Sequence, residues 1–152
     1  MKKIGDIAPD FTLLSNNNSM VSLPKDKITV LYFYPKDNTP GCTLEAKGFR
    51  DYYKEFLDKD ITILGISTDN YNSHKKFSEK YALPFPILSD EKGIICKEYG
   101  TIKNKGIYKL KNMTKRSTFL IDKNHKILYV WDKVKIDKHP QDILKKFDEI
   151  KQ

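Results

Sequence analysis

A β-branched and aromatic run that ends in a proline-containing loop and a cysteine is the feature that most constrains the fold. Residues 27–34 have the composition of a buried central strand. Two prolines and a glycine then enforce a tight loop over 35–41, and apolar residues recur at helical spacing from Ala46 to Phe56. The pattern predicts a strand–loop–helix unit with Cys42 in the first turn of the helix.

This placement of Cys42 favours a reactive thiol. The first turn of a helix has backbone N–H groups without intrahelical partners, and the positive end of the helix dipole lies there. Both effects stabilise an anion, so we expect the thiol of Cys42 to ionise more easily than a free cysteine. The simplest interpretation is a reactive thiolate.

The composition fits one domain over residues 1–152, with a core large enough to fold without covalent crosslinks. The longest apolar runs, such as Val30 to Tyr34, have the length of a strand and not of a membrane span. The first residues lack the apolar region of a signal peptide. Two cysteines do not make a disulfide scaffold, so we expect a cytoplasmic protein that is not bound to a membrane.

The net charge of +8 raises the question of a nucleic-acid partner. Residues 97–116 contain seven basic side chains against a single acid, Glu98. This stretch contains glycine and asparagine and is typical of an exposed lysine-rich loop, which we favour over a phosphate-binding patch. No nucleic-acid-binding motif accompanies it, so we expect no nucleic-acid partner.

Strand and helix patterns alternate through the rest of the chain. The sequence predicts strands at 11–14, 20–23, 61–67, 87–88, 117–121 and 126–131, and helices at 41–58, 71–82, 91–99 and 139–150. Strand–helix–strand crossovers followed by a hairpin and a final helix predict an α/β fold, with a mixed central sheet flanked by helices on both faces. That is the thioredoxin-like order.

The remaining polar candidates favour structural roles. His74, His125 and His139 have no metal-ligand spacing with either cysteine, so we predict all three at the surface or in turns and expect no metal site. Asp37 is typical of a turn residue, although its place near the cysteine leaves open a role as a general acid. No phosphate-binding loop or dinucleotide glycine fingerprint is present, so no bound cofactor is implied.

The pattern P-x-x-x-T-x-x-C, formed here by Pro35, Thr39 and Cys42, resembles the active-site signature of peroxiredoxins. The longer string over 32–46 is similar to that of the bacterioferritin-comigratory, or Q-type, subfamily of thioredoxin-dependent thiol peroxidases. Further matches lie at 5–11, 64–69 and 116–122, in the same order as in the family.

This resemblance implies an enzyme and assigns roles to four residues. Cys42 would be the peroxidatic cysteine, which attacks hydrogen peroxide or an organic hydroperoxide and becomes a sulfenic acid. Thr39 and Arg116 would orient the thiolate and the peroxide, and Pro35 would shield the pocket. Because ionisation alone accelerates a thiol only about tenfold near neutral pH, we expect most of the rate to come from stabilisation of the transition state.

One departure from the family bears on the second half of the cycle. Many Q-type members have a resolving cysteine five residues after the peroxidatic one, where this chain has Lys47, and others have it on the helix predicted at 71–82, which contains none. Cys96 is the candidate that remains, although a small buried hydrophobe is the simpler interpretation. We therefore expect a one-cysteine cycle in which thioredoxin, glutaredoxin or a small thiol reduces the sulfenic acid. Q-type relatives are often monomers, and we expect a monomer here.

A non-enzymatic alternative remains, in which a thioredoxin-like protein serves as a redox sensor or as a holdase that captures partners through Cys42. The presence of both Thr39 and Arg116 favours the peroxidase. A disulfide oxidoreductase is disfavoured, since the first position of a C-x-x-C motif is occupied here by Thr39.

Overall fold

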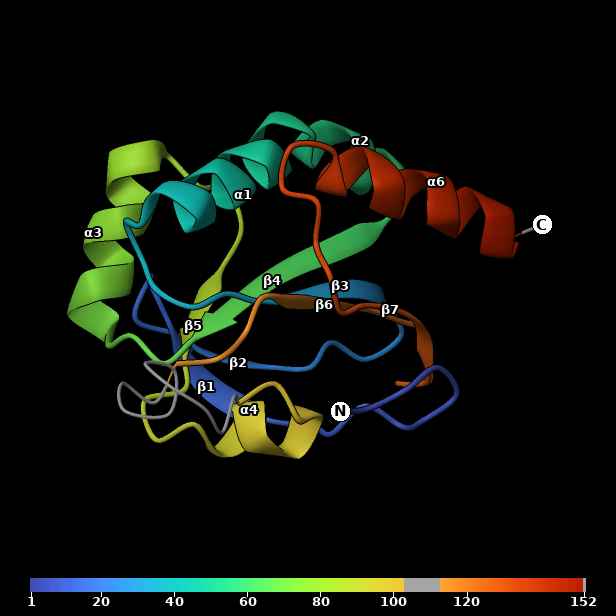
Figure 1. The fold of residues 1–152 in the computed structure, drawn as a ribbon, viewed down its shortest axis with the longest axis horizontal. Coiled ribbons are helices and arrows are strands. Elements are labelled where there is room, and N and C mark those ends of the chain that lie inside the picture. The colour runs from blue at the N-terminus through green and yellow to red at the C-terminus, as the bar shows by residue number, and fades with distance from the viewer. Residues whose placement is uncertain (103–112, 152) are drawn as a thin grey trace.

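The computed structural model describes residues 1–102 and 113–151, which form a mixed sheet covered by helices (Figure 1). The strands are β1 (Thr12–Ser15), β2 (Met20–Ser22), β3 (Ile28–Phe33), β4 (Ile61–Ser67), β5 (Ile87–Ser89), β6 (Ser117–Ile121) and β7 (Ile127–Trp131). The helices are α1 (Pro40–Asp51), α2 (Tyr53–Asp58), α3 (Tyr71–Tyr81), α4 (Ile94–Tyr99) and α6 (His139–Lys151). The strand order β2-β1-β5-β4-β3-β6-β7 is that of a seven-stranded sheet, and the predicted α/β class is confirmed.

The centre of the sheet determines where the loop after β3 lies. β3 pairs in parallel with β4 and antiparallel with β6, and in the second pairing Phe33 lies opposite Ser117. The carboxyl end of β3 and the amino end of β6 therefore lie side by side at the same end of the strands. Residue Arg116, which immediately precedes β6, is placed beside the loop that leads into α1.

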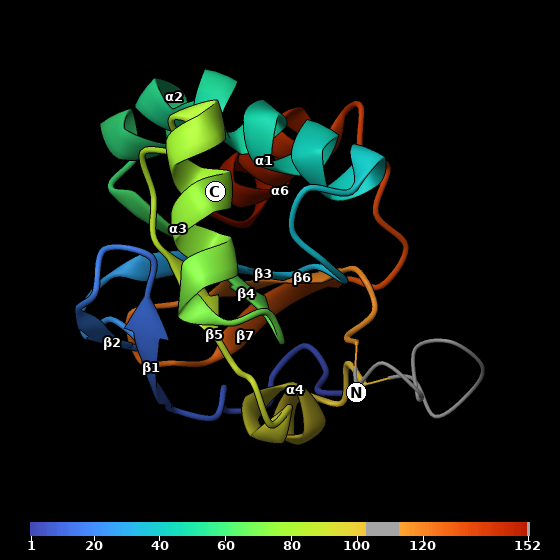
Figure 2. The ribbon, with the colours of Figure 1, turned by 90° about the vertical axis from the view of Figure 1, so that its left-hand side faces the viewer.

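Two separate apolar layers pack against the two faces of the sheet (Figures 1 and 2). Side chains alternate along β3, so Val30 and Tyr32 point into one layer and Leu31 and Phe33 into the other. Helices α1, α2, α3 and α6 cover the first face, whereas α4 and the N-terminal residues cover the second. Helices thus flank the sheet on both faces, as the sequence predicts.

The helix predicted over 41–58 is in fact two helices. Tyr52 interrupts it with φ −102° and ψ 8°, and its N–H still donates to the Gly48 carbonyl at the end of α1. α4 begins at Ile94 and not at 91, because Gly93 has φ +69° and cannot continue a right-handed helix backwards. Half of the basic stretch 97–116, with four of its seven basic side chains, lies in residues 103–112, outside the described residues. Among the helices that the structure describes, none has the length and apolar character needed to cross a bilayer.

Candidate active site

Cys42 is the third residue of α1 and lies beneath the surface. Thr39 precedes the helix with an extended backbone, φ −88° and ψ 155°, and Pro40 occupies the first helical position, where its lack of an N–H has no cost. The thiol side chain is only 1% exposed and belongs to the apolar layer under α1. The predicted position in the first helical turn is confirmed.

Arg116 links this sulfur to a buried carboxylate. Its Nη2 donates to Cys42 Sγ at 3.5 Å, while Nη1 donates to Glu45 Oε1 at 2.6 Å. Glu45 follows Cys42 by three residues, so the two side chains lie on the same face of α1. One planar guanidinium therefore binds both groups at once, and its orientation is determined by the pair.

Gly41 leaves room for this arrangement. A Cβ atom at this position would lie 3.1 Å from Arg116 Nη2 and 3.4 Å from Ile136 Cδ1. The first separation is tighter than most real Cβ contacts, so a larger residue at 41 requires the guanidinium to shift by a few tenths of an ångström.

Burial controls the charge of the groups around the sulfur. Removal from water raises the pKa of Glu45 from 4.5 to about 7, and this effect outweighs the stabilising charge of Arg116. Burial opposes the charge of Arg116, yet Glu45 and Cys42 raise its pKa above the ordinary value, so it remains a cation. Burial also raises the pKa of Tyr32, as do Glu45 and Cys42 in that order, and this phenol stays neutral.

Thr39 and Pro35 lie in the loop between β3 and α1, and both are half-buried. Thr39 Oγ1 donates to the Lys36 carbonyl at 2.8 Å. The hydroxyl hydrogen is thereby directed into the loop, and the lone pairs of the oxygen remain available to accept a hydrogen bond. Thr39 and Pro35 thus lie in the loop that leads directly to Cys42, and Arg116 is the predicted site residue that donates to its sulfur.

The prediction for two of the three histidines is wrong. His74 is 0% exposed on α3 because Asp37, Tyr34 and the Leu88 carbonyl surround its ring. His139 is 1% exposed at the start of α6, where its Nε2 lies 2.7 Å from Thr118 Oγ1. Burial and the charge of Arg116 lower the pKa of His139 to about 3, so it is neutral. His125 is in the turn between β6 and β7, as predicted.

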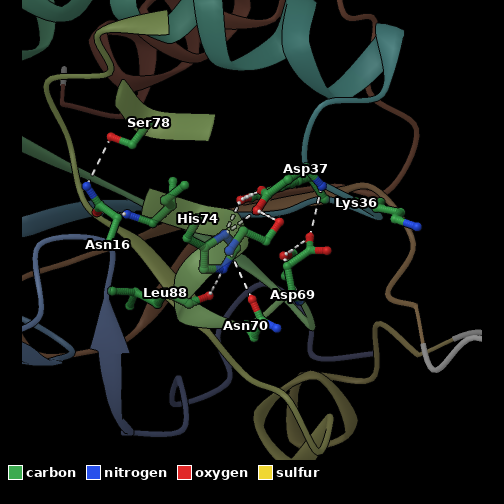
Figure 3. A network of polar contacts seen from close by, with 12 residues as sticks. Asn16, Lys36, Asp37, Asp69, Asn70, His74, Ser78 and Leu88 are labelled. Atoms are coloured by element: carbon green, nitrogen blue, oxygen red, sulfur yellow. Dashed lines mark hydrogen bonds and ion pairs between the residues drawn. The ribbon is translucent and has the colours of Figure 1, made fainter. Parts of the chain in front are cut away.

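Asp37 is a turn residue, as predicted, but it is also buried, at 6% exposure (Figure 3). Ligand atoms of Asp37, Asp69 and His74 lie within 4.8 Å of one another, a spacing that could hold a metal ion. Each of these atoms is, however, already engaged in a hydrogen bond within the protein. The cluster is a self-satisfied polar network, and the contacts of the Asp37 carboxylate run to α3 and Tyr34 and not to Cys42.

Cys96 lies on the other side of the sheet. It is fully buried in α4, within the apolar layer that contains Leu31 and Phe33, whereas Cys42 belongs to the opposite layer. Burial, together with the charge of Asp90, raises the pKa of Cys96, so its thiol is neutral. Both cysteines are free thiols.

Glu45 is the site residue that the sequence reasoning did not single out. The signal was present, because a residue three positions after a cysteine in a helix shares its face. A glutamate on the buried stripe of an amphipathic helix also needs a cationic partner. Arg116 was already a candidate, and the pair could have been predicted from those two facts together.

Comparisons with known proteins agree with this geometry. Residues 4–130 match the model of the AhpC/TSA family. A putative peroxiredoxin bcp from Coxiella burnetii is 44% identical over 146 residues, which cover 93% of this chain and 96% of that protein. A mutant of PrxQ from Xylella fastidiosa superposes with a TM-score of 0.92 at 34% identity, covering 100% of this chain and 99% of that chain.

A third similar protein is the bacterioferritin comigratory protein of Xanthomonas campestris, whose structure was described in relation to its alkyl peroxide reduction activity. It is 31% identical, has a TM-score of 0.87, and covers 98% of this chain and 99% of that chain. The fold and the site thus define a thiol-dependent peroxidase with a thioredoxin-like fold. The chain belongs to the AhpC/TSA family, among homologues of the Bcp and peroxiredoxin Q type. Its substrates are a peroxide and a thiol reductant, and the non-enzymatic alternative is not favoured.

Proposed function

We propose that Cys42 is the peroxidatic cysteine and that the chain runs a one-cysteine cycle completed by an external thiol. The observation that carries the proposal is the guanidinium of Arg116, which donates to Cys42 Sγ at 3.5 Å while Glu45 holds its other nitrogen at 2.6 Å. A permanently charged donor fixed beside a buried sulfur stabilises the thiolate and the charge that develops during attack.

In the first step the thiolate of Cys42 attacks one peroxide oxygen. The O–O bond breaks, the sulfur becomes a sulfenic acid, and the departing oxygen takes a proton and leaves as water or an alcohol. Arg116 is placed to stabilise the negative charge as it passes from the sulfur to the departing oxygen. The buried site excludes water, which strengthens this interaction.

Thr39 and Pro35 complete the site in this proposal. The Thr39 hydroxyl donates its hydrogen to the Lys36 carbonyl, so its oxygen can accept the O–H of a hydroperoxide and orient it. Pro35 offers a ring without an N–H next to this position, and it shields the sulfur from water without competing for the peroxide.

In the second step an external thiol attacks the sulfenic sulfur, releasing water and forming a mixed disulfide, and a second thiol then displaces the Cys42 thiolate. Thioredoxin is the reductant that we propose first, with glutaredoxin or a small thiol as alternatives. Cys96 is not proposed as the resolving residue, because the sheet lies between it and Cys42. Since Cys42 is only 1% exposed, the start of α1 must move before a protein thiol can reach its sulfur.

A hollow beside α1 supports organic hydroperoxides as substrates alongside hydrogen peroxide. It has a volume of about 550 Å³ between α1 and the segment before α6, and it is lined by apolar Leu44, Val134, Ile136 and Pro140 together with polar Lys47, Asp51, Asp137 and Gln141. Ile136 connects it to the site, because its Cδ1 is within 3.4 Å of the position that a Cβ on Gly41 would take. An alkyl substituent could occupy the hollow while the hydroperoxide group faces Cys42.

We also propose that the protein acts as a cytoplasmic monomer without a nucleic-acid partner. Both cysteines are free thiols, the state that a reducing compartment maintains. Light scattering tests the monomer, and a salt-dependent mobility-shift assay tests the absence of nucleic-acid binding.

Intact mass after one equivalent of hydrogen peroxide tests the cycle, on the wild type and on Cys96→Ser and Cys42→Ser. We expect the wild type and Cys96→Ser each to gain one oxygen, and Cys42→Ser to remain unchanged. A loss of two hydrogens in the wild type but not in Cys96→Ser would make Cys96 the resolving residue. Rapid peroxide consumption by Cys42→Ser would refute the assignment of Cys42.

A further inference from the structure

The loop that delivers Cys42 to its site is held by a buried polar network on α3 (Figure 3). Asp37 Oδ1 accepts a hydrogen bond from the Tyr34 hydroxyl at 2.6 Å. Its Oδ2 accepts one from the Ser73 hydroxyl at 2.8 Å and lies 2.7 Å from His74 Nδ1. Asp37 is five residues before Cys42 and two before Thr39, so the network fixes the loop immediately upstream of the site.

The loop backbone is held from the same direction. The N–H of Asp37 donates to Asp69 Oδ2 at 2.8 Å, and the Ser67 hydroxyl donates to the same oxygen at 2.7 Å. Asp69 lies between β4 and α3, so both the side chain and the backbone of Asp37 are attached to the β4–α3 unit. The next residue, Asn38, has φ +61°, a left-handed turn conformation that asparagine adopts more readily than most residues.

His74 is the centre of the network and is wholly buried. Its Nε2 lies 3.0 Å from the Leu88 carbonyl oxygen, and its Nδ1 faces the Asp37 carboxylate. Both neighbours are hydrogen-bond acceptors, so the ring satisfies them fully only when each nitrogen carries a hydrogen. The Asp37 contact joins the loop to α3, and the Leu88 contact joins α3 to β5.

These contacts do not involve the reacting atoms, yet they position the loop that contains Thr39 and leads to Cys42. Thr39 Oγ1 bonds within the loop to Lys36, and Cys42 is held through Arg116 from β6. The Asp37–His74 pair connects the loop to α3, together with the Ser73 bond to Asp37 and the contacts of Lys80 and Tyr81 with Asn38. None of these contacts involves a group that touches the sulfur.

We propose that Asp37 and His74 are positioning residues whose hydrogen bond holds the 35–39 loop and Cys42 in the peroxide-reactive arrangement, and whose separation admits the thiol reductant. The inference rests on the proposed role of Cys42. The protein exchanges between a closed form, which reacts with peroxide, and an open form, whose sulfenic acid is accessible to thiols. The pair sets the population of each form.

If the proposal is right, loss of the pair changes the rates of peroxide reduction and of sulfenic acid reduction in opposite directions. Removing the pair lowers the population of the closed form and raises that of the open form. In Asp37→Ala we expect the second-order rate constant with hydrogen peroxide to fall about tenfold or more, and the rate of sulfenic acid reduction by dithiothreitol to rise about tenfold. In Asp37→Asn, whose amide can donate to His74 Nδ1, both rates should return most of the way to those of the wild type.

The experiment measures both half-reactions by stopped flow on the wild type, Asp37→Ala, Asp37→Asn and Ser73→Ala. Lys75→Gln, an exposed change on the same helix, is the matched control and should leave both rates unchanged. Ser73→Ala removes a single bond to Asp37 and should change both rates a few-fold in the same opposite directions, so it carries the test if Asp37→Ala fails to fold.

A merely structural role would lower both rates together, in proportion to the folded fraction, and that result would overturn the proposal, as would unchanged rates in Asp37→Ala. Failure of the proposed function is a separate outcome, because the wild type itself would then form no sulfenic acid at Cys42 with peroxide.

Discussion

The buried carboxylate of Glu45 makes a quantitative prediction about stability. The change is Glu45→Gln, which keeps the shape of the side chain and its carbonyl acceptor for Arg116 but removes the ionisable group. In the folded protein the carboxyl holds its proton up to about pH 7, because burial raises its pKa from 4.5 to about 7. In the unfolded chain it releases the proton near its ordinary pKa of about 4.3.

Between these two values the folded state binds more protons than the unfolded state, so stability falls as the pH rises. The full difference between 4.5 and about 7 corresponds to about 3 kcal/mol, at 1.36 kcal/mol per pKa unit. About 2.5 kcal/mol of it is lost between about pH 5 and about pH 8. The glutamine variant has no such loss, so the free energy of unfolding of Glu45→Gln minus that of the wild type should increase by about 2.5 kcal/mol over this interval.

Urea unfolding measures this difference, with the fluorescence of Trp131 as the probe. Trp131 is the single tryptophan of the chain, and its ring contacts Tyr129 and His139, so its emission should change on unfolding. Subtracting the two proteins at each pH cancels the titration of the other groups. Glu79→Gln, on an exposed part of α3, is the matched control and should show a difference that does not vary with pH. A difference that is equally flat for Glu45→Gln would refute the reasoning.

Three further predictions concern separate parts of the molecule. Arg116→Lys loses the planar fork that binds the sulfur and the carboxylate together, so the rate constant with peroxide should fall about hundredfold in stopped flow; an undiminished rate would show that a point charge suffices. Gly65→Ala places a Cβ 2.9 Å from Tyr32 Cζ and should lower the free energy of unfolding by about 1–3 kcal/mol in urea, and an unchanged midpoint would contradict this. In native protein a small thiol reagent should modify Cys42 faster than Cys96, because the start of α1 opens more readily than the sheet and α4 that bury the neutral Cys96, whereas urea should expose both; equally rapid native labelling of the two would contradict this.

Local sequence patterns were sufficient to predict the strand–loop–helix unit and the position of Cys42. The strand, the loop and the helix start lie within one short stretch of chain, and each has its own local signal in residue type or spacing. The hairpin of β6 and β7 could be predicted for the same reason. The interruption at Tyr52 could not, because that position has neither glycine nor proline to signal it.

The two buried histidines show where sequence reasoning stops. The partner of His74, Asp37, is 37 residues away, and the partner of His139, Thr118, is 21 residues away. No local pattern distinguishes a buried histidine with distant partners from one at the surface. Glu45 is an intermediate case between predictable and unpredictable residues. Its spacing from Cys42 is a local signal, whereas its contact with Arg116 spans 71 residues.

The sheet also divides the chain into positions that could and could not supply a second thiol to Cys42. The helical residues in the layer of α1 and α3 lie on the same side of the sheet as the sulfur, so local unwinding of a helix, which costs a fraction of the stability of the fold, can bring some of them closer to it. A residue in the layer of α4 could reach it only if the strands themselves separated, which is global unfolding. A single substitution by cysteine in the helices of the α1 and α3 layer, at Lys47 in α1 for example, could therefore give an enzyme that forms an intramolecular disulfide with Cys42. A substitution at Cys96 therefore affects the packing of the layer around α4 and leaves the chemistry at Cys42 unchanged.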